Sequence, residues 1–168
     1  MQPLSPAGLE KAALSYLERY AASTVQLRRV LERRVMRAAA AGLDTGQAAG
    51  WIAAILAKLA RAGYLDDARF AAARAGSLHR QGRPAARIRQ DLAARGVAAE
   101  QIDDALALLA ADGGEDIAAA RAFARRRRLG PWRSGPGGPE RLRRELAALG
   151  RAGFSYEVAR QALAGDAG

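Results

Sequence analysis

The chain has 168 residues, no cysteine and a formal net charge of +10 at neutral pH. The lack of cysteine excludes disulfides and thiolate metal sites, and the positive charge favours a polyanionic partner: nucleic acid, an acidic protein surface or an anionic membrane. Half of the residues are hydrophobic, yet only 5% are aromatic, which predicts helices packed through narrow seams rather than one thick core.

The charge is unevenly distributed along the chain. Residues 1–65 contain nine basic and four acidic residues, residues 66–112 contain seven of each, and residues 113–168 contain eleven and six. The basic residues are 25 arginines and two lysines, and asparagine is absent. This ratio is also typical of GC-rich coding, which does not set the sign of the net charge. Two basic ends therefore flank a neutral middle.

The predicted secondary structure is helical throughout. Apolar residues recur three or four positions apart in three stretches, as expected for one face of a helix. These stripes are Ile52, Ile55, Leu56 and Leu59; Ile102, Ala105, Leu106 and Leu109; and Ala159, Ala162 and Leu163. A glycine followed by a hydrophobic residue precedes each stripe, and such a pair is typical of a helix C-cap. The pairs are Gly42-Leu43, Gly96-Val97 and Gly153-Phe154.

The recurrence of this pattern divides the chain into three segments. We predict an all-α protein of three tandem, divergent three-helix repeats in an elongated, curved arrangement. The repeats are expected at residues 1–65, which are basic, 66–112, which are neutral, and 113–168, which are basic. Residues 130–139 contain three prolines and four glycines, and we predict that they form a non-helical loop that splits the third repeat. Residues 112–115 are predicted to be a hinge.

The first repeat contains a helix with a basic stripe. Arg29, Arg33 and Arg37 recur every four residues and therefore share one face of the helix. Arg28 and Arg34 flank this stripe. Like charges at this spacing mildly destabilise a helix. The stripe indicates either an electrostatic contact with phosphates or acidic side chains, or an ordinary solvated face.

The second repeat opens on an acidic pair. Asp66 and Asp67 precede an apolar-periodic stretch, and we interpret them as N-cap and first-turn residues rather than as a catalytic or metal-binding pair. His79 is the single histidine, and the chain offers it no nucleophile–base or metal-ligand partners. We therefore predict no catalytic residues, no metal site and no cofactor.

Three arginines follow in the same repeat. Arg80, Arg83 and Arg87 line the next turn and the beginning of the helix after it. Arg87 and Asp91 are four residues apart and can form an ion pair on that helix. These arginines are interpreted first as a solvated face and second as a contact site.

The third repeat carries the densest positive charge. Arg125, Arg126, Arg127 and Arg128 form a run that exceeds what the dipole at a helix C-terminus requires. Trp132 and Arg133 follow in the Gly/Pro loop, where the indole either stacks on a base or partner surface or, as we favour, fills a gap between helices. Arg143 lies opposite a leucine stripe, and Glu140 is placed to pair with Arg144.

The N-terminus lacks the basic-then-apolar pattern of a secretory signal. No apolar run reaches the length that crosses a membrane, because the best candidate, residues 38–60, is interrupted by Asp44, Gln47 and Lys58. We therefore expect a soluble, cytoplasmic protein that does not associate with a membrane.

The chain resembles the RecX family of bacterial regulatory proteins. The resemblance covers roughly residues 25–164 and is most specific in the central repeat. There it rests on Gly63-Tyr64-Leu65-Asp66-Asp67, Phe70, Gly82, Ile88, Leu92, Gly96-Val97 and Ile102. Towards the C-terminus it rests on Phe123-Ala124-Arg125-Arg126, Leu129-Gly130-Pro131, Ala152-Gly153-Phe154-Ser155 and Ala159. The first repeat departs from the family pattern in a long alanine-rich connection.

The resemblance implies a modular helical protein whose partner is the recombinase RecA, assembled as a filament on single-stranded DNA. Family members lodge along the filament groove and usually inhibit ATP hydrolysis, strand exchange and co-protease activity, in recombinational DNA repair and the SOS response. The family has no catalytic residues to transfer to this sequence. The resemblance therefore implies a non-enzymatic regulator.

From the charge pattern, we expect the contacts with the partner to be made by arginines. The candidates are Arg29, Arg33, Arg37, Arg80, Arg83, Arg87, Arg125, Arg126, Arg127, Arg128, Arg133 and Arg143. The alternatives are a basic helical protein that binds single- or double-stranded DNA directly, and a purely structural helical adaptor. The lack of asparagine counts against sequence-specific base readout, and alternating charge around the repeats favours a monomer.

Overall fold

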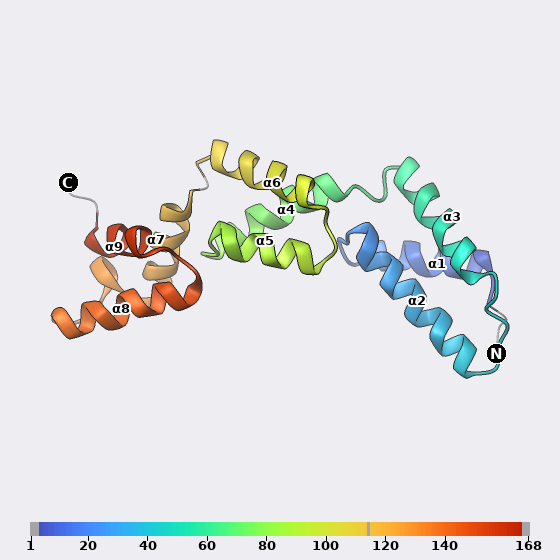
Figure 1. The fold of residues 1–168 in the computed structure, drawn as a ribbon, viewed down its shortest axis with the longest axis horizontal. Coiled ribbons are helices and arrows are strands. Elements are labelled where there is room, and N and C mark those ends of the chain that lie inside the picture. The colour runs from blue at the N-terminus through green and yellow to red at the C-terminus, as the bar shows by residue number, and fades with distance from the viewer. Residues whose placement is uncertain (1–3, 114, 166–168) are drawn as a thin grey trace.

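The computed structural model describes residues 4–113 and 115–165, and the regular structure in this part of the chain is entirely helical. The helices are α1 (Pro6–Leu17), α2 (Thr24–Ala40), α3 (Ala48–Arg61), α4 (Asp67–Arg80), α5 (Ala85–Ala94), α6 (Ala99–Ala111), α7 (Asp116–Arg127), the 3₁₀ helix η1 (Gly130–Trp132), α8 (Pro139–Ala152) and α9 (Tyr156–Ala164). They follow one another in an elongated row (Figure 1). The prediction of an all-α chain of three-helix repeats is confirmed.

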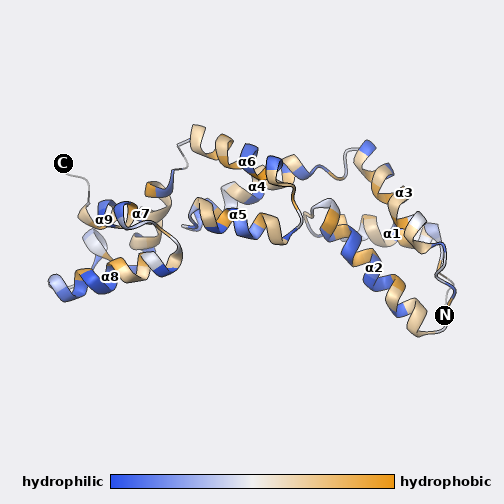
Figure 2. Ribbon diagram, viewed as in Figure 1, coloured by the Kyte–Doolittle hydropathy of each residue, from blue (hydrophilic) through white to orange (hydrophobic). Residues whose placement is uncertain are grey.

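Each group of three consecutive helices surrounds its own hydrophobic cluster. Leu27, Leu31 and Ile55 belong to the first cluster, Ile88 and Leu92 to the second, and all five side chains are buried. The third cluster is formed by Ala119, Ala120, Ala124, Leu149, Phe154, Ala159, Ala162 and Leu163. We refer to α1–α3, α4–α6 and α7–α9 as the N-terminal, central and C-terminal units. Along α2 and α8, hydrophilic and hydrophobic residues alternate, as in helices with one buried face (Figure 2).

Alanine lets the helices of the later units pack closely. In the central unit, Ala71 and Ala75 of α4 are fully buried, and in the C-terminal unit the same holds for Ala119 and Ala124 of α7. A methyl side chain keeps two helix axes near each other, so a small apolar volume suffices to fill the seam. The alanine-rich composition therefore gives three thin clusters instead of one thick core.

The predicted glycine caps are confirmed at the ends of α5 and α8. Gly96 and Gly153 adopt φ values of +76° and +104°, which are left-handed and favour glycine. The backbone N of Val97 donates to the carbonyl oxygen of Leu92 at 3.1 Å. The corresponding bond from Phe154 is 3.2 Å long. Both apolar residues are buried, so each pair ends a helix and returns the chain to the cluster.

The loop in the C-terminal unit is shorter than predicted. Gly130–Trp132 forms η1, and Pro139 is the first residue of α8, so the prediction that residues 130–139 contain no helix is wrong at both ends. Proline suits the first position of a helix because its missing N–H has no intrahelical partner there. Trp132 is half-buried against the third cluster, as predicted for a residue that fills a gap between helices.

Two further observations complete the fold. Residue 114, in the middle of the predicted hinge, lies outside the described residues. Among the helices of the described residues, none is long and apolar enough to cross a membrane.

Candidate functional site

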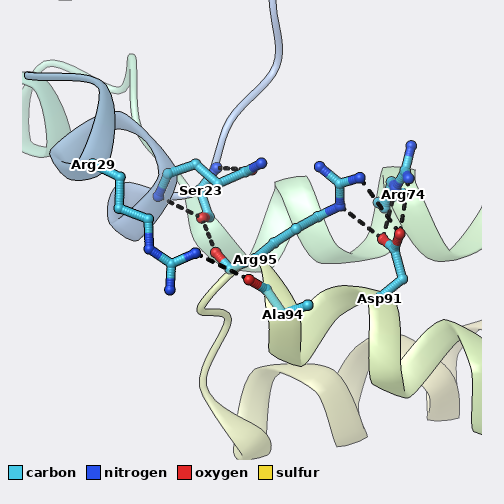
Figure 3. A network of polar contacts seen from close by, with 7 residues as sticks. Ser23, Arg29, Arg74, Asp91, Ala94 and Arg95 are labelled. Atoms are coloured by element: carbon cyan, nitrogen blue, oxygen red, sulfur yellow. Dashed lines mark hydrogen bonds and ion pairs between the residues drawn. The ribbon is translucent and has the colours of Figure 1, made fainter. Parts of the chain in front are cut away.

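The N-terminal and central units meet in a joint at the start of α2. The Oδ1 atom of Asp67, in the first turn of α4, accepts a hydrogen bond from the backbone N of Thr24 at 2.7 Å and another from its hydroxyl at 3.1 Å. Ser23, the N-cap of α2, donates through its hydroxyl to the carbonyl oxygen of Arg95. Arg29 donates to the carbonyl oxygen of Ala94 at 3.1 Å (Figure 3). We call this contact the first joint.

The central and C-terminal units meet in a second joint with the same plan. Asp116, in the first turn of α7, accepts from the backbone N of Ala85 at 2.8 Å. Arg87 donates to the carbonyl oxygens of Arg151 at 3.3 Å and Ala152 at 3.5 Å. In both joints an aspartate that begins one unit satisfies an unpaired N–H at the start of the preceding unit's middle helix. In both, an arginine of that middle helix reaches the carbonyl end of the next unit's middle helix.

At both joints a glycine lets side chains of the preceding unit approach closely. A Cβ atom on Gly96 would lie 2.5 Å from the Cβ atom of Val25, and one on Gly153 would lie 3.1 Å from the Cγ atom of Arg87 and 3.3 Å from the Cγ atom of Pro84. A larger residue at Gly96 would therefore clash with Val25, and one at Gly153 would press against Arg87 and Pro84 of the preceding unit. The glycines that end α5 and α8 serve the joints as well as the helix termini.

The second joint has an additional contact from α7. Arg126 donates to the carbonyl oxygen of Gln81 at the end of α4. A Cβ atom on Gly82 would lie 3.1 Å from the backbone N of Phe123 and 3.3 Å from the carbonyl oxygen of Ala119. The turn after α4 is thus pressed against α7, and Arg126 is engaged within the molecule.

A charged cluster braces the end of α5 at the first joint. Asp91 pairs with Arg74 at 2.9 Å and with Arg95 at 2.8 Å (Figure 3). The hydrogen bond from Arg74, followed by that from Arg95, lowers the pKa of Asp91 to about 2. The same hydrogen bond raises the pKa of Arg74. The predicted pair of Arg87 with Asp91 is not formed, because Asp91 is taken by these two arginines and Arg87 instead donates to the side chain of Gln90 at 3.0 Å.

A buried carboxylate organises the loop of the C-terminal unit. Glu145 is only 4% exposed, and its Oε2 atom accepts from the backbone N of Gly130 at 3.1 Å. Arg141 and Arg133 approach the same carboxylate at 3.5 Å and 3.8 Å. Arg133 also donates through Nε to the carbonyl oxygen of Gly130 at 2.7 Å. Arg133 therefore stabilises the Gly/Pro loop between α7 and α8, in which it lies.

The arginines in the run at the end of α7 make different contacts. Arg127 lies over the ring of Phe123, 5.4 Å from its centroid, in a cation–π contact. Arg127, Arg128 and Arg144 also line a cleft of about 690 Å³ between α7 and α8. Arg144 pairs with Glu140 at 3.5 Å, as predicted. The lining of the cleft therefore combines four arginines with the carboxylates of Glu140 and Glu145.

The structure separates the twelve candidate arginines by what their side chains contact. Arg29, Arg87 and Arg126 lie at the joints, whereas Arg37 donates to the carbonyl oxygen of its own helix at Arg33. Exposed candidates without a side-chain hydrogen bond, ion pair or cation–π contact, within the described residues, are Arg33, Arg80, Arg83, Arg125, Arg128 and Arg143. These six are the candidate arginines left for a partner, and they occur in all three units.

Sequence reasoning named Asp67, Arg29 and Arg87 but missed their role in the joints. It did not single out Asp116. Asp67 and Asp116 each begin a unit, and this recurrence was the signal that could have identified them. The Asp66 cap was predicted correctly, since its side chain accepts from the backbone N of Arg69 at 2.9 Å. Among the described residues, no three His, Cys, Asp or Glu side chains gather in a way that could hold a metal ion.

Comparison with known proteins gives a consistent result. Residues 66–106 match the family described as RecX, second three-helix domain. The chain is 46% identical over 162 residues to the regulatory protein RecX of Myxococcus xanthus strain DK1622, which covers 95% of this chain and 86% of that protein. It is also 34% identical over 100 residues to the regulatory protein RecX of Agrobacterium fabrum strain C58, covering 60% of this chain and 52% of that protein.

Solved structures share the fold. The crystal structure of RecX from Lactobacillus salivarius superposes with a TM-score of 0.69 at 17% identity and covers 94% of each chain. A second crystal structure, of a regulatory protein RecX, gives a TM-score of 0.68 at 23% identity over 94% of this chain and 70% of that one. The sequence identity to the Myxococcus protein, over most of both chains, shows that this chain belongs to the RecX family of regulatory proteins.

Proposed function

We propose that this protein is a non-enzymatic regulator of recombinational DNA repair that binds the RecA filament on single-stranded DNA. Binding lowers the filament's ATP hydrolysis, strand exchange and co-protease activity. Membership of the RecX family supports a regulatory role. The observation that carries the more specific proposal is the elongated row of units held by two matching joints, with unpaired arginines along it.

An elongated row of units fits a partner made of repeated subunits better than a single compact domain would. Three units in a line meet several subunits of a filament at once, and each weak contact raises the effective concentration of the next. The basic N-terminal and C-terminal units face the acidic, DNA-filled groove, while the neutral central unit acts as a spacer. The protein acts as a monomer in the cytoplasm, where recombinase filaments form.

The joints explain how binding changes the filament, because they fix the distance between the units. A spacer of fixed length bound to neighbouring subunits favours the subunit spacing that matches it and disfavours others. A ligand shifts an equilibrium only through different affinities for the two states. Bridging by the joined units supplies that difference, because a filament state with another spacing loses one of the end contacts.

The test adds the protein to preformed recombinase filaments on single-stranded DNA and follows ATP hydrolysis. We expect hydrolysis to fall as the protein approaches one copy per several recombinase subunits, the ratio expected for an elongated chain that spans them. Unchanged hydrolysis at equimolar amounts would contradict the proposal.

The competing interpretation, a basic protein that only sequesters DNA, is distinguished in the same assay. Sequestration is relieved by adding more single-stranded DNA, whereas inhibition through the filament persists when that DNA is already coated with recombinase. Naked-DNA binding alone would also show the steep salt dependence of phosphate contacts.

A further inference from the structure

A groove between α1 and α2 lies outside the set of residues that sequence reasoning selected, apart from Arg37. It has a volume of about 230 Å³. Drug-sized ligands occupy pockets of about 300–1,000 Å³, so this groove admits a smaller group. Val30 and Leu31 contribute an apolar floor, and Leu31 is fully buried.

One wall of the groove is aromatic. Tyr16 and Tyr20 lie with ring centroids 5.1 Å apart and planes tilted by 43°. The backbone N of Tyr20 donates to the carbonyl oxygen of Tyr16 at 2.9 Å, which positions the Tyr20 backbone just beyond the end of α1. Tyr20 is nevertheless 58% exposed. An exposed ring beside an apolar floor offers a surface on which another flat ring can stack.

The rim of the groove is basic. Arg19, Arg34 and Arg37 line it, and every charged residue in the lining is an arginine. Among the described residues, Arg19 and Arg34 have no side-chain hydrogen bond or ion pair, and Arg37 uses only its Nε atom, on the carbonyl oxygen of Arg33. Three neighbouring guanidinium groups without a counter-ion favour an anionic ligand.

We propose that this groove binds one unpaired nucleotide of single-stranded DNA, with the base stacked on Tyr20 and the flanking phosphates on Arg19 and Arg34. Aromatic side chains inside a positively charged groove are the usual platform for single strands. Duplex DNA presents its phosphates but not the faces of its bases, so it meets only the basic rim. An acidic peptide likewise has no need of the exposed ring.

This inference rests on the proposed function only for where the strand is met, since recombinase filaments carry single-stranded DNA. It is tested on a free oligonucleotide without recombinase. Failure of that test would leave the effect on ATP hydrolysis untouched, and a failure of the filament assay would leave the groove's affinity for a free strand measurable.

The first experiment measures the fluorescence anisotropy of a labelled oligothymidylate with the full chain. We expect Tyr20→Ala to weaken binding roughly tenfold, which lies within the range for losing one base–aromatic stack. Tyr20→Trp should retain binding because it retains the stacking face. Tyr156→Ala is the matched control, since Tyr156 is 69% exposed on α9 and lies outside the groove. Equal affinities of the Tyr20→Ala and Tyr156→Ala variants would overturn the proposal.

The second experiment compares two charge reversals on α2. Arg34→Glu alters the rim, whereas Arg28→Glu changes the net charge equally from an exposed position outside the groove lining. We expect Arg34→Glu to reduce the slope of log affinity against log salt by at least about 0.7, the value for one phosphate contact on a single strand. Equal slopes for both variants would contradict the proposal.

Two further outcomes would also overturn it. If duplex DNA of equal length bound as tightly as the single strand and Tyr20→Ala had no effect on either, the rim alone would be the site. If Arg34→Glu weakened association with recombinase filaments but not with the oligonucleotide, the groove would be a protein-docking surface.

Discussion

Arginine side chains have different roles at the joints and on the outer faces of the three units. Arg29 and Arg33 are one helical turn apart on α2, yet Arg29 donates across the first joint, whereas Arg33 is exposed and has no side-chain partner among the described residues. The difference arises because the end of α5 brings unpaired carbonyl oxygens within reach of Arg29. A basic stripe therefore indicates a ligand only after the carbonyl groups of neighbouring units have been considered.

The largest expected effect comes from closing the space in the first joint. Gly96→Ala would place a Cβ atom 2.5 Å from Val25 and impose a left-handed φ of +76° on alanine. The backbone term costs about 1–2 kcal/mol and overpacking about 1–3 kcal/mol more. We expect a loss of about 3 kcal/mol in urea denaturation, together with altered small-angle X-ray scattering.

The control for this change is Gly63→Ala. Gly63 has a φ of +80° but open space around its Cβ position, so it bears the backbone cost alone. If the two variants lost equal stability and scattered alike, the close approach at the joint would not matter.

The next effect concerns the aspartates that begin each unit. Asp67→Ala and Asp116→Ala each remove an acceptor for the start of a middle helix, which should cost about 1–2 kcal/mol. Hydrogen exchange should show faster exchange at the amide of Thr24 in the first variant and of Ala85 in the second. Exchange that stayed protected at both amides would argue that other contacts hold the joints.

The cluster at Asp91 predicts a pH dependence. The folded-state pKa of Asp91, about 2, lies below the value of about 3.9 for an unfolded aspartate. The contribution of Asp91 to the free energy of unfolding is therefore present above about pH 4 and is lost as the pH falls towards 2. Because the pair is partly exposed, we expect this contribution to be about 1 kcal/mol. Urea denaturation at pH 5 and pH 2.5 should show a smaller pH effect for Asp91→Asn than for the wild type, and equal effects would refute the assignment.

The smallest effect compares the two arginines of α2 directly. Arg29→Ala loses one charge-assisted hydrogen bond to Ala94 and should cost about 0.5–1 kcal/mol. Arg33→Ala should change stability by less than about 0.5 kcal/mol, as is usual for an exposed residue without partners. A reversed order in thermal denaturation would mean that the contact across the joint does not stabilise the protein.

The sequence predicts those features that depend on neighbouring residues. Gly96 and Gly153 end helices because a left-handed residue followed by an apolar one is a local requirement. Asp66 caps α4 for a similarly local reason. The helical stripes depend only on period and therefore place the three clusters correctly.

The joints could not be predicted in this way, because their partners are distant in sequence. Thr24 and Asp67 are 43 residues apart, and an aspartate in a first turn has the same local pattern whether it caps its own helix or another. The predicted pair of Arg87 with Asp91 failed for the same reason. Asp91 is engaged by Arg74 from α4, 17 residues earlier, and no helical spacing reveals that competitor.

We propose that the outward arginines bind the filament, while the joint arginines maintain the row. The sharpest test of this division is the double variant Arg125→Glu with Arg128→Glu, at two exposed positions without side-chain partners among the described residues. The control, Lys11→Glu with Arg61→Glu, changes the net charge equally at exposed positions outside the candidate set. We predict that the first pair weakens co-sedimentation with recombinase filaments at least tenfold at unchanged helicity, while the control stays near wild type. Equal binding by the two double variants would contradict the claim.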